Sequence, residues 1–516
     1  MGESHTAAAL AEPFGNFSAI LASWAKEHPD APALRDDRGE LTWAELGDRI
    51  ERTAARLVDT GLERGQSVAI LGTSTIEYAV VFLAAVRAGG VAAPLTTSAS
   101  RAQLEGMARD SGARHLFIDA AKRAELGADF MPELDQVPLE DLDAWMAPPG
   151  TRAPAFEPQP GDHFNIIYSS GTTGIPKGIV HSHQMRWRQF AATAASYHAA
   201  GLPVRSLAST PLYSNTTMVA FLAALLAGGM VRVMGKFDGA KWLAHAQADR
   251  TTVTMLVPVQ YQRLMDEPRF DHFDLSSLAL KYCTSAPFSA DLKRQVLARM
   301  PGGLVEIYSM TEGGVVCLLA AHEFPDKLHT VGRPAPGSKL RVLDDADRPV
   351  PPGTPGNLVG RSQTMMAGYK NRPDQTREGY WTDPETGDVW QRMGDIGRVD
   401  EDGFVELVGR AKDMIISGGF NIFPSDLEAE LEKEPGVAEA AVVGVPSAKW
   451  GETPVGFVRL AGGGSTEAIL AAVNARLGKA QRLAALHAID EMPRSHIGKL
   501  LKSELRDEAE RRGLPG

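Results

Sequence analysis

The chain is poor in cysteine and in net basic charge. Its two cysteines, Cys283 and Cys317, lie too far apart for a disulfide framework or a metal-ligand spacing. Its formal net charge is −11 at pH 7. General nucleic-acid binders and membrane-surface binders need a basic face, so this charge argues against both classes. A local basic pocket for an anionic ligand is still compatible with it.

Long hydrophobic runs are also missing. The two most apolar stretches, residues 78–95 and 218–231, are interrupted by Arg87 or by glycine pairs. Both fall short of the roughly 20 apolar residues that a transmembrane helix needs. We interpret them as buried helices that lead into strands. The N-terminal segment MGESHTAAAL has no apolar run of a secretory signal. We therefore expect a soluble protein with no integral membrane segment.

Three common nucleotide-binding and catalytic patterns are absent. There is no G-x-S-x-G elbow of a serine hydrolase, and no G-x-G-x-x-G of a dinucleotide dehydrogenase follows a predicted strand. The segment YSSGTTGIPKG, residues 168–178, is not a P-loop either. Pro176 removes a donor N–H before Lys177, and Gly178 supplies no metal-binding hydroxyl after it.

The same segment nevertheless has the features of an anion-binding loop. It follows the β-prone run HFNIIY, and its glycines allow backbone N–H groups to converge on an anion. Hydroxyl groups and one lysine add further donors. The residues concerned are Ser169, Ser170, Gly171, Thr172, Thr173, Gly174 and Lys177. They favour a phosphate-binding loop, and the alternative is a flexible surface loop.

Helical and strand patterns alternate through the first part of the chain. Residues 42–61 have helical periodicity with Thr42 as N-cap, and residues 67–71 follow as a strand. A second helix over 75–90 leads to a strand over 91–95. This alternation predicts an α/β fold with mostly parallel sheets.

The later parts of the chain differ in composition and in predicted secondary structure. A Pro-rich linker or surface loop covers residues 146–162, and the α/β pattern then resumes. From Val331 to Arg410, short strands with many Gly and Pro indicate a β-rich subdomain. The last hundred or so residues alternate strands and helices, which indicates a separate small domain.

Three further segments carry polar residues suited to nucleotide chemistry. EIYSMTEGG places Glu312 after a short strand, where a carboxylate could carry Mg²⁺. Asp395 lies in a predicted turn, where a carboxylate can accept both ribose hydroxyls. Lys499 is predicted at the start of the last helix, which is unfavourable for the helix dipole and suggests an anionic partner. Taken singly, a solvated strand end, a turn aspartate and a surface lysine are the favoured explanations. The pair His181 and His183 has no third metal ligand at a useful spacing.

In combination, these segments resemble the motifs of the acyl-adenylate-forming family, which includes acyl-CoA and aryl-CoA synthetases. YSSGTTGIPKG is similar to the family's phosphate loop, YSMTE to its Tyr-Gly-x-Thr-Glu motif, and RMGDIG to its Thr-Gly-Asp element. GRAKDMIISGGFNIFPSDLE is similar to its domain-junction motif, and PRSHIGKL to its C-terminal lysine motif. The five motifs occur in the family's order over nearly the whole chain.

The resemblance implies a role for each matching residue in ATP binding. The loop from Ser169 to Lys177 would hold the β- and γ-phosphates, and Thr311 and Glu312 would meet the α-phosphate and Mg²⁺. Lys499 would bridge the attacking carboxylate and the α-phosphate. The nucleoside contacts would come from Tyr308 on one face of adenine, Ser285, Ala286 and Pro287 on the other, and Asp395 and Arg410 on the ribose.

The resemblance also implies residues for the second half-reaction. Lys412 would be the hinge, and Gly418 and Gly419 would line the tunnel for the pantetheine arm. Trp450 would stack on the CoA adenine, and Arg482 would contact a CoA phosphate. The implied domains are residues 1–409 with the β-rich subdomain at about 331–409, a hinge at 410–412, and a small mobile α+β C-terminal lid at 413–516.

Departures from the family pattern concentrate at the acyl pocket. Ser214 stands where many relatives carry histidine or another aromatic, Ser309 replaces a glycine, and Thr284 and Ser285 replace Gly-Ala. The helix that begins at residues 181–183 should line this pocket. We predict a roomy, partly polar pocket formed by Ala192, Ser214, Asn215, Thr216, Ser309 and Gly313. The acid itself is left open.

The resemblance therefore implies a cytoplasmic, Mg²⁺- and ATP-dependent acyl- or aryl-CoA synthetase. A carboxylate and ATP would give acyl-AMP and pyrophosphate, and the thiol of coenzyme A would then give acyl-CoA and AMP. One alternative is an acyl-AMP ligase that loads a carrier-protein thiol, although no carrier domain is fused to this chain. The other is a non-catalytic nucleotide-binding relative, which the presence of Lys499, Glu312 and Asp395 disfavours.

Overall fold

The computed structural model describes residues 5–169, 176–417, 420–447, 450–462, 464–478, 481–495 and 498–513. The chain forms two compact units. Unit 1 comprises Met1–Leu328, Ala335–Lys339 and Arg361–Gln391. Unit 2 comprises His329–Pro334, Leu340–Gly360 and Arg392–Gly516.

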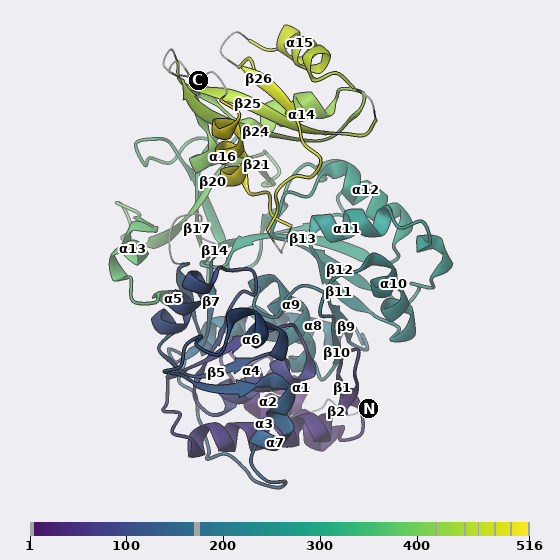
Figure 1. Ribbon diagram of the computed structural model, residues 1–516, viewed down its shortest axis with the longest axis vertical. Coiled ribbons are helices and arrows are strands. Elements are labelled where there is room, and N and C mark those ends of the chain that lie inside the picture. The colour runs from purple at the N-terminus through teal and green to yellow at the C-terminus, as the bar shows by residue number, and fades with distance from the viewer. Residues whose placement is uncertain are drawn as a thin grey trace. The chain divides into compact units, whose positions relative to one another are not determined.

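Unit 1 contains a seven-stranded sheet that is parallel over most of its width (Figure 1). Strands β7, β4, β3, β5 and β6 run parallel to their neighbours, whereas β8 and β18 are antiparallel at one edge. In spatial order the strands are β18 (Gly368–Tyr369), β8 (Gly178–Ser182), β7 (His163–Tyr168), β4 (Val91–Pro94), β3 (Ser67–Leu71), β5 (Ala113–Ile118) and β6 (Asp135–Pro138).

A second sheet of unit 1 has the same mixed character. Its central strands are parallel, and antiparallel strands β14 and β2 extend it on either side. The order is β14 (Gly313–Ala320), β13 (Gly303–Met310), β12 (Leu280–Cys283), β11 (Val253–Leu256), β9 (Arg205–Ala208), β10 (Met230–Val233), β1 (Pro32–Arg35) and β2 (Glu40–Thr42).

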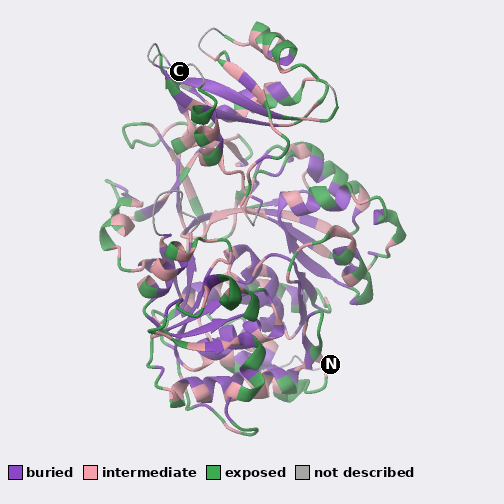
Figure 2. Cartoon of the chain, in the orientation of Figure 1, coloured by how far each residue is buried: buried purple, intermediate pink, exposed green. Residues whose placement is uncertain are grey.

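Two apolar helices connect the cores of these sheets. Helix α4 (Ile76–Arg87) is buried at ten of its positions, and α9 (Asn215–Leu226) is similarly buried, so neither has a polar face. Both belong to one core cluster that includes Ile70 of β3 and Val231 of β10. Figure 2 shows the strands of both sheets largely in the colour of buried residues. The two apolar stretches of the sequence are therefore buried helices, and each leads into a strand as expected.

The remaining helices of unit 1 surround these sheets. They are α1 (His5–Ala9), α2 (Phe17–Glu27), α3 (Trp43–Asp59), α5 (Arg101–Ser111), α6 (Ala120–Leu126), α7 (Leu142–Trp145), α8 (His183–Ala199), α10 (Gly239–Ala248), α11 (Pro258–Met265), α12 (Ala290–Arg299) and α13 (Pro373–Glu378).

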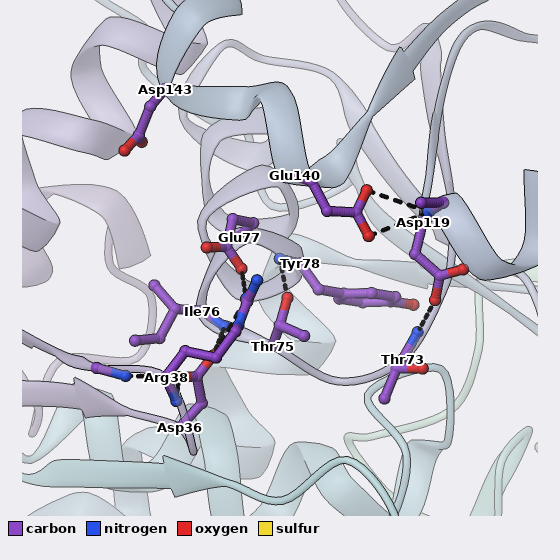
Figure 3. Close-up of polar contacts among 12 residues, drawn as sticks. Asp36, Arg38, Thr73, Thr75, Ile76, Glu77, Tyr78, Asp119, Glu140 and Asp143 are labelled. Atoms are coloured by element: carbon purple, nitrogen blue, oxygen red, sulfur yellow. Dashed lines mark hydrogen bonds and ion pairs between the residues drawn. The ribbon is translucent and has the colours of Figure 1, made fainter.

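The turn between β3 and α4 shows how local sequence starts a helix. The Thr75 hydroxyl accepts a hydrogen bond from the Tyr78 N–H, as an N-cap should. Asp36 accepts from the Ile76 N–H at 3.1 Å, and Asp119 accepts from the Thr73 N–H at 2.7 Å (Figure 3). The side chains that directly follow β1 and β5 thus satisfy one free backbone donor at the helix start and one in the turn before it.

The segment from Val331 to Arg410 is rich in short strands, as predicted. Strands β16, β17 and β20 are hydrogen-bonded neighbours, and β21 pairs with β20. Their bounds are β15 (Arg333–Pro334), β16 (Lys339–Leu343), β17 (Gly356–Arg361), β19 (Tyr380–Thr382), β20 (Val389–Val399) and β21 (Val405–Arg410). One strand of this segment, β18, instead extends the seven-stranded sheet of unit 1. The predicted hinge and domain boundary at 410–412 stay a prediction.

The C-terminal part of unit 2 is an α+β layer around a mostly antiparallel sheet. The strand order is β23 (Phe420–Ile422), β22 (Ile415–Ser417), β25 (Gly451–Leu460) and β24 (Val437–Ser447), and β26 (Ala485–Ala488) pairs in parallel with β25. Helices α14 (Pro424–Glu432) and α16 (Lys502–Arg511) pack on β24, and α15 (Thr466–Arg476) packs near β26. The predicted α/β class with a smaller α+β C-terminal part is confirmed. Among the described residues, no helix is both long and apolar enough to span a bilayer.

Candidate functional site

The predicted phosphate loop connects two antiparallel strands. Tyr168 of β7 pairs with Gly178 of β8. The Ser169 N–H donates to the Lys177 carbonyl at 2.9 Å, and the Lys177 N–H donates to the Ser169 hydroxyl at 3.3 Å. A P-loop joins a strand to a helix, whereas this loop joins two antiparallel strands. The loop is therefore not a P-loop, as the sequence indicated. Ser170, Gly171, Thr172, Thr173 and Gly174 lie outside the described residues.

Tyr369 joins the two parts of the site that were predicted to meet phosphate and metal. Its hydroxyl donates to Glu312 Oε1 at 2.9 Å, and Lys177 Nζ lies 4.9 Å from the centre of its ring. Burial, and then the Glu312 charge, raise the pKa of Tyr369 above its usual value, so the phenol is a donor. Tyr369 was not among the residues predicted from the sequence. A single tyrosine at the edge strand β18 carries no spacing signal that connects it to Glu312.

Thr311 and Glu312 form the turn of the β13–β14 hairpin. We expected EIYSMTEGG to follow a short strand, but β13 continues through Tyr308 and Ser309 to Met310. The strand is longer because β14 returns antiparallel and pairs along it. The Thr311 carbonyl accepts from His181 Nε2 at 2.8 Å, so a second segment holds the turn.

Glu306, in the same hairpin, points away from this turn. Its carboxylate forms an ion pair with Lys293 at 2.5 Å, and both side chains are almost fully buried. Burial raises the pKa of Glu306 to about 7. This pair is part of the packing between α12 and β13.

The predicted adenine wall follows β12, the parallel neighbour of β13. Ser285 has φ +82°, a left-handed conformation that is strained for a residue with a side chain. Its hydroxyl lies 2.5 Å from the Thr216 hydroxyl, and Thr284 donates to the Ile307 carbonyl at 2.6 Å. The wall is therefore bonded both to the strand of Tyr308 and to the first turn of α9. Ala286 is half-buried and Pro287 is exposed.

Three of the six predicted acyl-pocket residues, Ser214, Asn215 and Thr216, lie at the N-terminus of α9. Ser214 is the N-cap of this helix and accepts from the Thr216 N–H at 3.3 Å, so its side chain already has a structural partner. Asn215 Oδ1 accepts from Arg186 at 2.9 Å. Ser309 is half-buried, Gly313 is buried, and Ala192 is exposed on α8. Their role in acyl binding stays a prediction.

Asp395 and Arg410 are direct partners in unit 2. We expected Asp395 in a turn, but it lies inside strand β20, opposite Arg410 at the end of β21. This antiparallel register brings the two side chains together, with Arg410 Nε 3.0 Å from Asp395 Oδ1. A β-bulge between Ile396 and Gly397 interrupts the pairing nearby.

Lys499 precedes the last helix instead of starting it. Helix α16 begins at Lys502, and a turn through Gly498, with φ +75°, returns the Lys499 carbonyl to the Ser495 N–H at 2.8 Å. The expected unfavourable position at a helix start is therefore wrong. Burial lowers the pKa of Lys499, and the charges of Arg410 and Lys412 lower it further. This amine thus lies in the electrostatic field of the Asp395–Arg410 pair.

The remaining predicted residues of unit 2 are accessible. Lys412 is exposed in the 3₁₀ turn Ala411–Asp413, Trp450 is 47% exposed, and Arg482 is exposed. Gly418 and Gly419 lie outside the described residues. The structure thus leaves the predicted CoA contacts as predictions.

The two histidines of the VHSHQ segment have structural partners. His181 uses both ring nitrogens, one with Arg186 and one with the Thr311 carbonyl. His183 packs edge-on against Phe164, and burial lowers its pKa to about 4. Among the described residues, no group of three His, Cys, Asp or Glu side chains could hold a metal ion by itself.

Comparison with known proteins identifies the family. The profile of the AMP-binding enzymes matches residues 21–370, and that of the AMP-binding enzyme C-terminal domain matches residues 426–499. The chain therefore belongs to the family of AMP-binding enzymes. The motif order noted in the sequence agrees with this membership.

Named relatives match the chain over nearly its whole length. Feruloyl-CoA synthase of Amycolatopsis sp is 34% identical, and the match covers 94% of this chain and 98% of that protein. Fatty acid–[acyl-carrier-protein] ligase ScoC of Streptomyces coeruleorubidus is 29% identical, with 94% of each covered. Among solved structures, ATP-bound MatB from Rhodopseudomonas palustris has a TM-score of 0.83 at 29% identity, covering 96% of this chain and 98% of that one.

Proposed function

We propose that this chain is an ATP-dependent acyl- or aryl-CoA synthetase, an acid–thiol ligase that forms AMP. A carboxylate attacks the α-phosphate of ATP to give acyl-AMP and pyrophosphate, and the CoA thiol then displaces AMP. The observation that carries the proposal is the constellation of Lys177, Tyr369 and Glu312 in an AMP-binding enzyme. In this constellation, Lys177 supplies a cation for phosphate, and Glu312 supplies a carboxylate for a metal ion that the phosphates also bind.

The phosphate end of ATP would bind at the loop from Ser169 to Lys177. The Lys177 charge and the backbone donors of this loop would hold the β- and γ-phosphates. Thr311 and Glu312 supply a hydroxyl and a carboxylate, the hard oxygen ligands that suit Mg²⁺ when it is also bound by substrate phosphates. Bound there, the ion would supply positive charge that offsets the phosphate charges. The Tyr369 hydroxyl would orient the Glu312 carboxylate.

Each unit supplies residues with a predicted role in nucleoside binding. Tyr308 and the Ser285–Pro287 segment would enclose adenine, and Asp395 would accept the two ribose hydroxyls beside Arg410. The ion pair between Asp395 and Arg410 supports this role because it orients the carboxylate.

Lys499 would supply the cation for the first half-reaction. The attacking carboxylate and the α-phosphate repel each other, and a protonated amine between them offsets that repulsion. The lowered pKa of Lys499 has a consequence for pH dependence. Because the role needs the protonated amine, adenylation should fall as the pH rises through this lowered pKa, earlier than for an ordinary lysine.

The second half-reaction would use a different set of residues. Rotation about Lys412 would withdraw Lys499 and bring Gly418 and Gly419 to the site, where they would line the path of the pantetheine arm. The exposed indole of Trp450 is suited to stacking on the CoA adenine, and Arg482 could pair with a CoA phosphate.

A carrier-protein thiol is the alternative acceptor. The relative ScoC is named as a ligase for an acyl-carrier protein, and the first half-reaction would be the same for both acceptors. The adenylation residues therefore do not distinguish them.

A panel of carboxylic acids tests the proposal. Aromatic acids such as ferulate, together with fatty acids and short dicarboxylic acids, are incubated with ATP and Mg²⁺ and either CoA or a phosphopantetheinylated carrier protein. We expect pyrophosphate release with one class of acid, and a CoA thioester by mass spectrometry. A thioester on the carrier protein alone would support the alternative. No pyrophosphate with any acid would contradict both.

A further inference from the structure

Arg186 is a fully buried arginine held by neutral groups. It lies on α8, beside α9 (Figure 1), and its relative exposure is 0%. No carboxylate forms an ion pair with it among the residues that the structure describes. Its guanidinium donates to Asn165 Oδ1 at 2.9 Å, Gln189 Oε1 at 2.7 Å, Asn215 Oδ1 at 2.9 Å and His181 Nδ1 at 2.8 Å.

This arrangement is costly for folding. An apolar side chain of similar volume would avoid the loss of hydration that a buried cation suffers, and no anion offsets that loss here. Burial accordingly lowers the pKa of Arg186 to about 9. The four polar neighbours satisfy the guanidinium but do not neutralise it, so a gain in stability does not explain the residue.

The guanidinium does determine the direction of the hydrogen bonds around it. Arginine has only donors, so every neighbour must present an acceptor. His181 therefore presents the lone pair of Nδ1 to Arg186 and carries its proton on Nε2. That N–H donates to the Thr311 carbonyl at 2.8 Å. A doubly protonated imidazole would direct an N–H at the guanidinium. Because two donors cannot form a hydrogen bond with each other, this arrangement excludes the doubly protonated form of His181.

The same rule applies on the other side of Arg186. Asn215 must direct Oδ1 at the guanidinium, which turns its amide NH₂ away. Asn215 is the first residue of α9, and the next residue, Thr216, is hydrogen-bonded to Ser285 of the predicted adenine wall. Arg186 thus connects this wall and the α9 N-terminus with the turn that carries Glu312.

We propose that Arg186 is a positioning residue for adenylation: through His181 it orients the Thr311–Glu312 turn, and through Asn215 it orients the first turn of α9. The proposal rests on the proposed function. Arg186 itself would not contact the reactants. It sets the tautomer and the amide orientation of the side chains that hold the two segments.

Two substitutions at His181 separate positioning from mere packing. In His181→Gln, the amide nitrogen reaches about as far as Nε2 and can still donate to the Thr311 carbonyl. In His181→Asn, the shorter amide can still accept from Arg186 but does not reach Thr311. Both keep a polar side chain in the buried site, so the comparison does not depend on Arg186→Met, which could fail to fold.

We measure pyrophosphate release at saturating acid, with ATP varied. His181→Asn and Arg186→Met should lower kcat about 10-fold or more, with KM for ATP within threefold, because misplacing a reacting group slows chemistry at saturation. His181→Gln should retain kcat within threefold of wild type. Arg188→Met is the matched control on the same helix and should stay within twofold. Equal kcat for the two His181 variants, or losses that follow the unfolding temperature alone, would overturn the proposal.

A spectroscopic measurement needs no substrate. In ¹⁵N-histidine-labelled protein, the His181 resonances are assigned by their loss in His181→Gln. Wild type should show a neutral imidazole with its proton on Nε2. Arg186→Met should allow a second proton on Nδ1 as the pH falls, because the Thr311 carbonyl still holds the Nε2 proton but the guanidinium no longer occupies Nδ1. An Nδ1-protonated wild type would overturn the proposal. If wild type releases no pyrophosphate with any acid, the proposed function fails, and the second protonation of His181 in Arg186→Met still decides whether Arg186 controls the protonation of His181.

Discussion

At the residue scale, the candidate site consists of side chains whose partners lie far away in the sequence. Tyr369 donates to Glu312 across 57 positions, and His181 donates to Thr311 across 130. Ser285 keeps a left-handed backbone conformation beside its bond to Thr216. Strained or strongly oriented residues persist where the surroundings over-determine them, and such places are frequently functional. The contacts from Tyr369 and His181 both reach the Thr311–Glu312 turn.

Replacement of Tyr369 by Phe tests the orientation of Glu312. The variant keeps the ring near Lys177 but removes the hydroxyl that donates to the carboxylate. A hydrogen bond to a charged group contributes about 1.5–3 kcal/mol, so we expect adenylation to fall by at least about 10-fold. The measurement is pyrophosphate release as a function of Mg²⁺ concentration, with a higher Mg²⁺ requirement expected for the variant.

Tyr380→Phe is the matched control for this experiment. Tyr380 is half-buried on β19, and its hydroxyl is not the donor to Glu312. Its loss should change the rate less than twofold. Equal losses for the two variants would show that Glu312 does not depend on the Tyr369 hydroxyl.

At the element scale, the β13–β14 hairpin presents the Thr311–Glu312 turn, which is predicted to meet the α-phosphate and the metal ion. Gly313, directly after Glu312, has φ +90° and lies against the backbone of Thr364 and Met365. A Cβ at Gly313 would stand 2.3 Å from the Thr364 carbonyl oxygen, closer than any normal contact. Both the backbone conformation and the space therefore require glycine, and the turn cannot keep its shape with any other residue.

Gly313→Ala should consequently destabilise the protein strongly. The left-handed conformation costs about 1–2 kcal/mol for alanine, and the clash with the backbone adds about 1–3 kcal/mol. Gly387→Ala is the control, because Gly387 has φ +73° with nothing near its Cβ position. Thermal and denaturant unfolding should show a loss about 1–3 kcal/mol larger for Gly313→Ala. A larger loss of stability for Gly387→Ala than for Gly313→Ala would mean that the hairpin can shift without cost.

At the scale of the whole molecule, the residues predicted to act on ATP belong to two compact units. Thr311, Glu312 and Lys177 belong to unit 1, whereas Asp395 and Lys499 belong to unit 2. A reaction with two half-reactions can use such a division, because one unit can present different residues to the other in turn. The proposed function requires this alternation.

Separate assays of the half-reactions test the alternation. Lys499→Ala should lower acyl-AMP formation on the order of 10²-fold, the scale expected for loss of a charge-stabilising group. It should leave thioester formation from pre-made acyl-AMP nearly intact. Gly419→Leu should do the reverse, because a side chain would obstruct the pantetheine path. If each variant slowed both half-reactions equally, alternation would be untenable.

Much of the fold could be predicted because its signals are local. An N-cap needs one side chain and a backbone N–H three residues on, so the helix that begins after Thr42 was predictable from neighbouring residues. The alternation of helices and strands, the buried character of α4 and the family motifs are likewise properties of short segments. These features determined the α/β class and the residue types available for nucleotide chemistry.

The tertiary structure decided which of those residues meet. The register of β20 with β21 pairs Asp395 with Arg410, and the pairing of β18 with β8 brings Tyr369 to Lys177 and Glu312. Register depends on the pairing of whole strands, so no single motif encodes it. The sequence by itself determined the chemistry that is available, and only the packing of distant segments determined its geometry, because electrostatic and hydrogen-bond interactions act through space and not along the chain.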